Sequence, residues 1–236
     1  MIYGIMQPYF LPYVGYFSLI EYADRFIFFD TPQYISHGWV NRNRVLKQDG
    51  GYTYITVPVK KAVRSAGIKE MRIDNSLRWK EKIYGQLTAY KRRAPRYNDT
   101  VEFLHHVLDA KEYDFLAQLN ADSIISICHK IGIECVYDTF SAMNLEIDKV
   151  HAPDEWALNM VKALGGDTYV NSPGGKAFFD PAKYERAGIR LQFLQSNLKP
   201  YIQRIGHFEP ALSIVDVMMF CREDEIRDMV KDYAFV

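Results

Sequence analysis

Cysteine is scarce in this sequence, and the few copies are not spaced for cross-linking. The 236 residues include three cysteines, Cys128, Cys135 and Cys221. An odd number without a paired short spacing argues against both a disulfide framework and a zinc site. Cys128 and Cys135 lie in apolar stretches and are expected to be buried, reduced thiols. The six histidines show no metal-ligand spacing either, so no metal site is expected.

The sequence also lacks an excess of either charge and a long apolar run. Lys and Arg total 29 and Asp and Glu total 29, so a nucleic-acid partner would need a local basic patch. The run Lys91–Arg93 is a small candidate, although a helix end before Pro95 accounts for it without a ligand. No apolar segment approaches the roughly 20 residues that span a bilayer. Residues 1–8 lack a cationic start and a cleavage site, so we expect a cytoplasmic protein without a membrane span.

A strand, loop, helix and strand follow one another at the start of the chain. The apolar run 2–6 predicts a buried strand, residues 14–22 a helix, and residues 26–29 a second buried strand. Such a βαβ unit implies a parallel sheet. The expected fold class is therefore α/β, with a Rossmann-like parallel sheet.

The rest of the chain alternates between hairpin, helical and α/β patterns. Further elements are predicted as a hairpin at 39–59, a weak strand at 68–73, three helices within 77–130, strands at 133–138, 168–171 and 189–193, and helices at 154–164, 180–187 and beyond 210. We expect residues 1–76 to form an α/β part with an N-terminal ligand loop and residues 77–131 a helical insertion. Residues 132–236 are expected to continue the same sheet and to end in a helical tail.

The loop after the first strand is the best candidate for a ligand site. Ligands of doubly wound sheets bind at the carboxyl ends of strands, where the next helix begins. Gln7 stands at such an end, and Pro8 and Pro12 stiffen the loop. Gly15 permits close backbone approach, and Tyr9, Tyr13 and Tyr16 offer stacking faces with hydroxyl groups. An aromatic loop packed over the core is the alternative.

Two further segments carry the polar groups that bind phosphate or sugar hydroxyls. Asn41, Arg42 and Asn43 supply amide and guanidinium donors, although an extended backbone would turn Arg42 away from the two amides. The segment Ser172–Lys176 follows a predicted strand, with Gly174 and Gly175 exposing amides and Lys176 able to neutralise phosphate. A solvated hairpin and a plain turn are the respective alternatives.

A fourth polar segment precedes the last helices. It holds Tyr201 and Gln203, followed by Ser213 and Asp216. Ser213 and Asp216 have the spacing of a helix capping box, which explains both residues without a ligand.

Together these segments resemble the WbqC-like family of bacterial proteins. The resemblance is carried by Gln7–Phe17, Asn41–Asn43, Tyr169–Gly175 and Tyr201–Asp216, in the expected order over nearly the whole chain. It implies an association with the biosynthesis of cell-surface polysaccharides, O-antigens included, that carry modified amino sugars.

A second similarity concerns the fold. Tyr13-Val14-Gly15-Tyr16 occupies the place where the nucleotidyltransferase and class I synthetase superfamily carries a His-x-Gly-His signature. That similarity implies an ATP-binding Rossmann-like sheet with a helical insertion. Tyrosine replaces both histidines and cannot supply an imidazolium charge, so it implies the fold more than adenylyl transfer.

We therefore expect a transferase that modifies a nucleotide-linked amino sugar, by acyl or glycyl amide formation in its most concrete version. Gln7, Tyr16 and Asp216 are expected to line the reacting centre, and ATP or a nucleotide-linked sugar is the implied cofactor or ligand. No nucleic-acid partner is expected except a tRNA that carries the donor. The alternative is a non-catalytic scaffold that binds a nucleotide or nucleotide sugar. The residues expected to bind substrate or phosphate are Pro8, Tyr9, Tyr13, Gly15, Asn41, Arg42, Asn43, Ser172, Gly174, Gly175, Lys176, Tyr201, Gln203 and Ser213.

Overall fold

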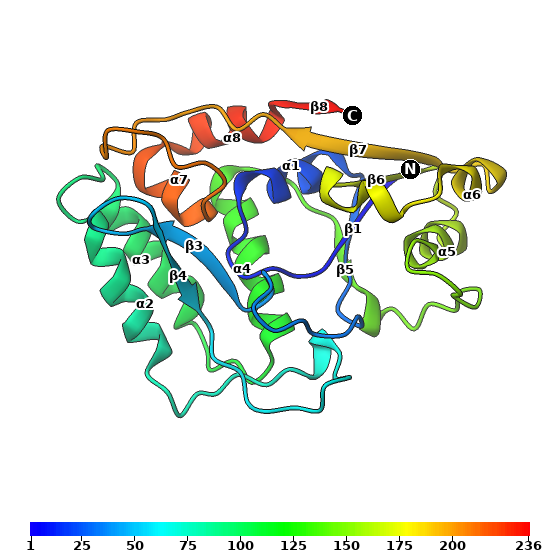
Figure 1. The fold of residues 1–236 in the computed structure, drawn as a ribbon, viewed down its shortest axis with the longest axis horizontal. Helices are drawn as coiled ribbons and strands as arrows, with labels where there is room; N and C mark the ends of the chain where they lie inside the picture. Colours follow the sequence, from blue (N-terminus) through cyan, green and yellow to red (C-terminus); the bar gives the residue numbers. More distant parts are fainter.

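A six-stranded, mostly parallel sheet forms the centre of the protein (Figure 1). The computed structural model describes residues 1–236. The strand order is β5-β2-β1-β6-β7-β8, in which only β8 runs antiparallel to its neighbour. The strands are β1 (Ile2–Met6), β2 (Arg25–Phe28), β5 (Tyr137–Thr139), β6 (Thr168–Asn171), β7 (Arg190–Ser196) and β8 (Tyr233–Phe235). The α/β class and the parallel sheet predicted from the sequence are confirmed.

Helices cover the two faces of this sheet. In Figure 1, α5 and α6 lie on one side of β1, and α1, α4 and α8 lie on the other. The apolar contacts divide in the same way: residues of α5 and α6 form one cluster with β1 and β6, and residues of α1, α4 and α8 join a larger cluster. The helices are α1 (Val14–Tyr22), α4 (Leu116–Ile131), α5 (Glu155–Ala163), α6 (Pro181–Arg186), α7 (Ile214–Phe220) and α8 (Glu223–Lys231).

The order of the strands creates a switch point between β1 and β6. From β1 the chain moves outward through α1 to β2, and later it returns through α5 to β6 on the other side of β1. Neighbouring strands whose connections leave in opposite directions open a crevice at their carboxyl ends. Gln7 directly follows the carboxyl end of β1, and Asn171 is the last residue of β6.

Successive side chains of β1 point to opposite faces of the sheet, and both faces are covered by helices. Tyr3 and Ile5 belong to the α5 and α6 side, and Gly4 faces the other side. A Cβ atom at Gly4 would lie 2.8 Å from Cδ2 of Phe26. Glycine at this position therefore lets Phe26 pack directly against the strand.

The long connection from β2 to β5 holds the hairpin and the helical block. The hairpin is a separate antiparallel sheet, so it does not extend the central sheet. Gln86 of the following helix donates from Nε2 to the carbonyl oxygen of Tyr54 at 3.0 Å, which joins the two parts. This connection contains β3 (Arg42–Leu46), β4 (Tyr52–Thr56), α2 (Trp79–Leu87), α3 (Tyr97–Leu108), α4 and the short 3₁₀ helices η1 (Ile68–Glu70) and η2 (Thr88–Tyr90). Two further 3₁₀ helices, η3 (Phe140–Ala142) and η4 (Pro173–Phe178), follow later in the chain.

Three local features differ from the predictions. The strand predicted at 133–138 is confined to β5, because only residues 137–139 pair with β2, and residues 133–136 form no regular structure. The strand predicted at 68–73 is wrong for Ile68–Glu70, which forms η1 because the Glu70 carboxylate accepts the Gly67 amide at 2.6 Å. The terminal strand β8 was not predicted, since its three residues pair only with β7 at the sheet edge.

Cys128 and Cys221 are buried and Cys135 is half-buried, all three as free thiols. No helix has the length and apolar character needed to cross a lipid bilayer.

Candidate functional site

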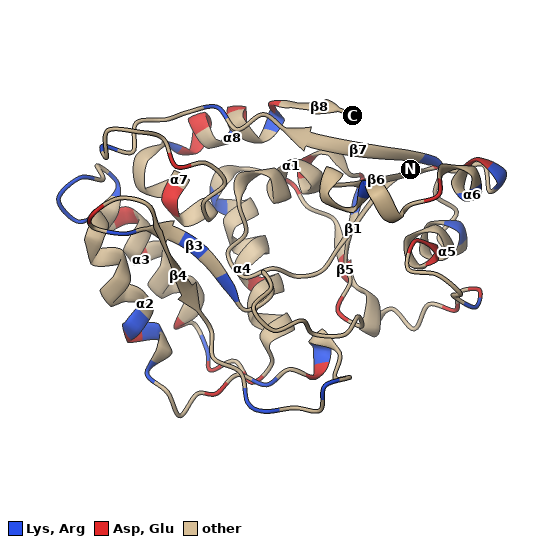
Figure 2. Ribbon diagram, viewed as in Figure 1, with Lys and Arg blue, Asp and Glu red and all other residues tan.

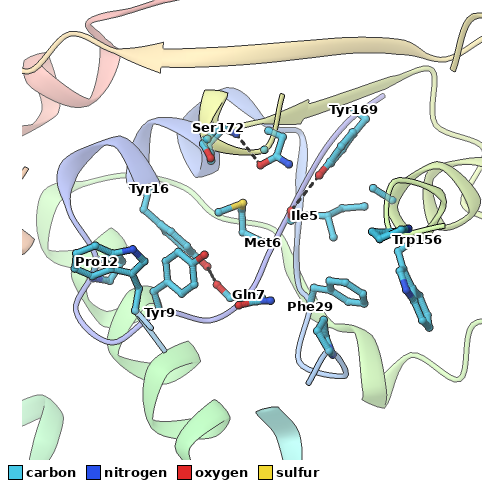
Figure 3. Close-up of a pocket in the computed structure, with 18 of the residues that line it drawn as sticks. Ile5, Met6, Gln7, Tyr9, Pro12, Tyr16, Phe29, Trp156, Tyr169 and Ser172 are labelled. Carbon is cyan, nitrogen blue, oxygen red and sulfur yellow. Dashed lines mark hydrogen bonds between the residues drawn. The ribbon is translucent and has the colours of Figure 1, made fainter. Parts of the chain in front are cut away.

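A cavity of about 670 Å³ lies at the switch point, against the carboxyl ends of β1 and β6 (Figure 3). Gln7 and Tyr16 approach it from the β1 side and Ser172 from the β6 side. Most of its 25 lining residues are apolar, as is usual for pockets that hold small molecules. The polar and amphipathic lining residues are Gln7, Tyr9, Tyr13, Tyr16, Trp39, Asn43, Arg44, Trp156, Tyr169, Asn171 and Ser172.

The loop that follows β1 is held through its backbone carbonyl groups. Each carbonyl from Gln7 to Pro12, apart from that of Tyr9, accepts a hydrogen bond from outside the loop. The donors are Tyr16 Oη to Gln7 (2.9 Å), Asn120 Nδ2 to Pro8 (2.8 Å), Asn43 Nδ2 to Phe10 (3.0 Å), Ser213 Oγ to Leu11 (2.6 Å) and the Ile214 amide to Pro12 (2.8 Å). These hydrogen bonds to the backbone carbonyls hold the loop in place without a ligand.

Three residues expected to contact substrate therefore have a direct structural task. Tyr16 and Asn43 line the cavity and also hold the loop. Ser213 is fully buried behind the loop, where its hydroxyl also accepts the amide of Val215 at the start of α7. The capping interpretation of Ser213 is confirmed.

Three polar residues of the first loop line the cavity, namely Gln7, Tyr9 and Tyr13. The side-chain amide of Gln7 and the hydroxyls of Tyr9 and Tyr13 form no hydrogen bond with another protein group. Pro8 is buried outside the lining. Burial raises the pKa of Tyr9, Tyr13 and Tyr16, so these hydroxyls stay protonated and can donate at neutral pH.

Gly15 shapes the site from beneath. It is buried and does not line the cavity. A Cβ atom there would lie 2.5 Å from Cε2 of Tyr13. The glycine therefore allows the Tyr13 ring, which lines the cavity, to lie across the first turn of α1.

The loop after β6 forms the facing wall. Asn171, Ser172, Gly174 and Gly175 line the cavity. The Ser172 amide donates to Asn171 Oδ1 at 2.7 Å, which orients the side chain and leaves its NH₂ group without a protein partner. Lys176 is exposed outside the lining, with Nζ 5.8 Å from the centre of the Phe193 ring.

The hairpin contributes one residue from each face to the cavity lining, Asn43 and Arg44. Asn41 and Asn43 are buried on its inner side, where Asn41 donates to the Val57 carbonyl at 3.0 Å. Arg42 points away, as the extended pattern predicted, and stacks 4.1 Å from the centre of the Tyr54 ring outside the cavity. Arg44 is not among the residues predicted to bind substrate, but it lines the cavity.

Asp216 lies away from the cavity in a buried polar cluster. Its carboxylate accepts hydrogen bonds from Tyr90 Oη at 2.6 Å, from Gln203 Nε2 at 2.9 Å and from Tyr201 Oη. Burial raises the pKa of Asp216 while these donors act against that rise. Through Asp216, Tyr201 and Gln203 join α7 to the segment before it, so the Asp216 carboxylate serves this contact instead of a capping box with Ser213.

The lining carries a single charged side chain. Arg44 is the one ionic group there, and no Asp, Glu, His or Lys lines the cavity. Its guanidinium donates to the Ala211 carbonyl at 2.9 Å, and its buried Nε has no partner. One cation is a poor match for the several negative charges of an ATP triphosphate. The lining suits a ligand that is mostly neutral and carries few anionic groups there.

Aromatic rings form much of the remaining wall, and they include residues not singled out in the sequence. Phe29 packs 5.4 Å from Trp156, measured between ring centres, and both line the cavity (Figure 3). Phe178 and Phe179, whose ring centres lie 4.6 Å apart, also line the cavity. Trp156 belongs to an ordinary amphipathic helix, so only its position after folding reveals it. No three His, Cys, Asp or Glu side chains anywhere in the chain are grouped to hold a metal ion.

Comparison with known proteins supports the resemblance found in the sequence. A model of the WbqC-like protein family matches residues 7–228, which include all the segments that form the cavity loops. A protein of Mycobacterium tuberculosis, "Uncharacterized protein Rv1507c", is 29% identical over 217 residues, or 91% of each chain. No solved structure matches the sequence. The chain belongs to the WbqC-like protein family.

Proposed function

We propose that the cavity binds the sugar of a nucleotide-linked amino sugar and that the protein transfers an acyl group to it during polysaccharide biosynthesis. The observation that supports this most is the position of the cavity at the switch point of a doubly wound sheet, where such folds bind nucleotides and related ligands. The same strand order supports placing the fold with the nucleotidyltransferase and class I synthetase type.

The lining chemistry supports a sugar ligand. Amides of Gln7 and Asn171 can pair with sugar hydroxyls, and the flat faces of Phe29 and Trp156 can stack on a sugar ring. Arg44 supplies one positive charge for a phosphate, and the exposed Lys176 stands directly after the cavity-lining Gly175.

The cavity lining contains no carboxylate or imidazole, so the reaction we propose is one that does not need a general base from these groups. Transfer from an already activated ester requires positioning and donors to the developing oxyanion more than a strong base. The sugar amine would attack the ester carbonyl, the C–N bond would form and the C–O bond would break. The amine proton would leave with the released alcohol. We assign Gln7 and Tyr16 to this centre. The Gln7 side-chain amide would donate to the developing oxyanion, and Tyr16 would position Gln7 through its hydrogen bond to the Gln7 carbonyl.

The experiment is an incubation of the protein with nucleotide-linked amino sugars and an activated glycyl donor, glycyl-tRNA, followed by mass spectrometry of the sugar. We expect a product heavier by one glycyl group. A parallel incubation with ATP and free glycine should give none, because the cavity poorly matches a triphosphate. Gln7→Ala should reduce turnover, whereas Gln118→Ala on the exposed side of α4 should not.

One observation favours a second candidate, a non-catalytic protein that binds nucleotide sugars. The lining holds no group that titrates near neutral pH. Trp39 and Trp156 line the cavity while Trp79 lies in α2, so tryptophan fluorescence can follow binding by itself. Binding without product across the panel would favour this candidate. If the protein shows no binding and forms no product, both candidate functions would be overturned.

A further inference from the structure

The segment 42–72 is strongly basic within a chain that is neutral overall. It contains eight Lys and Arg residues and only two acidic ones, Asp49 and Glu70. None of the eight lies within 4.0 Å of a carboxylate, although ion pairs are frequent elsewhere in the chain. Its positive charges are therefore not neutralised by the protein itself.

On the outer face of the hairpin, arginines alternate with aromatic rings. The Arg44 guanidinium lies 4.8 Å from the centre of the Tyr52 ring and 5.5 Å from that of Trp39. Arg42 stacks in the same way on Tyr54. Trp39 and Tyr52 each keep 41% of their surface exposed. The buried Nε atoms of both arginines have no hydrogen-bond partner.

A second basic run joins this face at the hairpin turn. Arg93 Nη2 donates to the Gln48 carbonyl at 2.8 Å, which brings the end of the run Lys91–Arg93 to the hairpin turn that follows Lys47. Figure 2 shows Lys and Arg both along β3 and in the loop between α2 and α3. Arg96 does not add to this surface, because it pairs with Glu223 at 2.7 Å.

We propose that this outer face binds single-stranded RNA. Stacking rings interleaved with guanidinium groups, next to unpaired lysines, are the means by which proteins hold unpaired nucleotides. A double helix hides its bases from such rings, and an acidic peptide would use the charges without the rings. A single strand uses both.

The face leads to the cavity, which gives the bound strand a role. Trp39 and Arg44 belong both to the outer face and to the cavity lining. An RNA lying along the hairpin would therefore bring its end to the proposed site of transfer. This role as carrier of the acyl group rests on the proposed function, whereas the binding of RNA does not.

The test is fluorescence anisotropy of the full chain with a short labelled single-stranded RNA over a range of salt concentrations. We expect Tyr52→Ala to weaken binding about fivefold or more, as the loss of one stacked base does. Tyr137→Ala, which removes a tyrosine of similar exposure on β5, should leave it unchanged. Lys47→Ala should lower the salt slope by about 0.7, whereas the exposed, unpaired Lys149→Ala should not.

The outcomes separate this inference from the proposed function. Failure of the RNA to bind at low salt, or equal binding of wild type and Tyr52→Ala, would overturn the RNA surface. Tighter binding of a duplex or of polyglutamate than of the single strand would overturn it too. Nucleotide-sugar binding is followed separately by tryptophan fluorescence, so its loss with RNA binding intact would count against the proposed function alone.

Discussion

Asn120 in the middle of α4 holds Pro8 at the start of the cavity loop. Its side-chain NH₂ donates to the Pro8 carbonyl at 2.8 Å and to the Val40 carbonyl at 2.7 Å. The side chain is fully buried, so one amide of the helical block ties the first loop to the start of the hairpin. The helical block thereby positions the candidate site without lining it.

Asn120→Ala should destabilise the protein by about 2–4 kcal/mol, because it leaves two buried carbonyl groups without donors. Urea unfolding measures this change. Gln118→Ala on the exposed side of the same helix is the control and should change stability by less than about 0.5 kcal/mol. A loss for Asn120→Ala as small as that of the control would show that Asn120 does not hold the loop.

Tyr16→Phe should cost about 1 kcal/mol of stability, because it removes the 2.9 Å hydrogen bond to the Gln7 carbonyl and leaves the ring in place. Chemical denaturation provides the measurement. Tyr9→Phe removes a hydroxyl that bonds no protein group and should leave stability unchanged while weakening ligand binding. If Tyr9→Phe lowered stability more than Tyr16→Phe, the structural role assigned to the Tyr16 hydroxyl would be contradicted.

Gly15→Ala should displace the Tyr13 ring, since the new methyl group would lie 2.5 Å from it. We expect a lower melting temperature and weaker ligand binding. Gly85→Ala in α2 is the matched control. No atom lies within 4 Å of its new methyl group, so it should stabilise the helix by up to about 1 kcal/mol. A Gly15→Ala variant as stable as wild type would show that Tyr13 has room to move.

Glu155 should make stability depend on acid pH. A hydrogen bond from Lys183 at 2.9 Å and the amide of His151 lower the pKa of Glu155 from 4.5 to about 2. A lowered folded-state pKa stabilises the fold above the unfolded value, and that contribution disappears as pH falls from about 4.5 to about 2.

Melting temperatures between pH 2 and pH 6 measure this dependence. Glu155→Gln should reduce the fall in melting temperature between pH 4.5 and about pH 2, because Glu155 no longer contributes to it. Glu185→Gln, which removes a carboxylate without an ion pair, should leave that fall unchanged. Identical curves for wild type and Glu155→Gln would contradict the assigned pKa.

The sequence by itself determined the local elements nearest the site. The predicted limits 2–6, 14–22 and 168–171 agree with β1, α1 and β6, because apolar periodicity and flanking Pro and Gly act within a few residues. It also located both cavity loops, since the ends of parallel strands share one edge of the sheet.

Only the tertiary structure decided which polar groups face the cavity. Nothing local distinguishes Asn43, which holds the loop from the cavity wall, from Asn41 beside it, and the place of Asp216 depends on Tyr90, 126 residues away in sequence. The same is true of Asn120 and Trp156, which sit in ordinary amphipathic helices. Buried polar groups take whichever partners the packed chain brings within hydrogen-bond distance, and that choice is made by contacts distant in sequence.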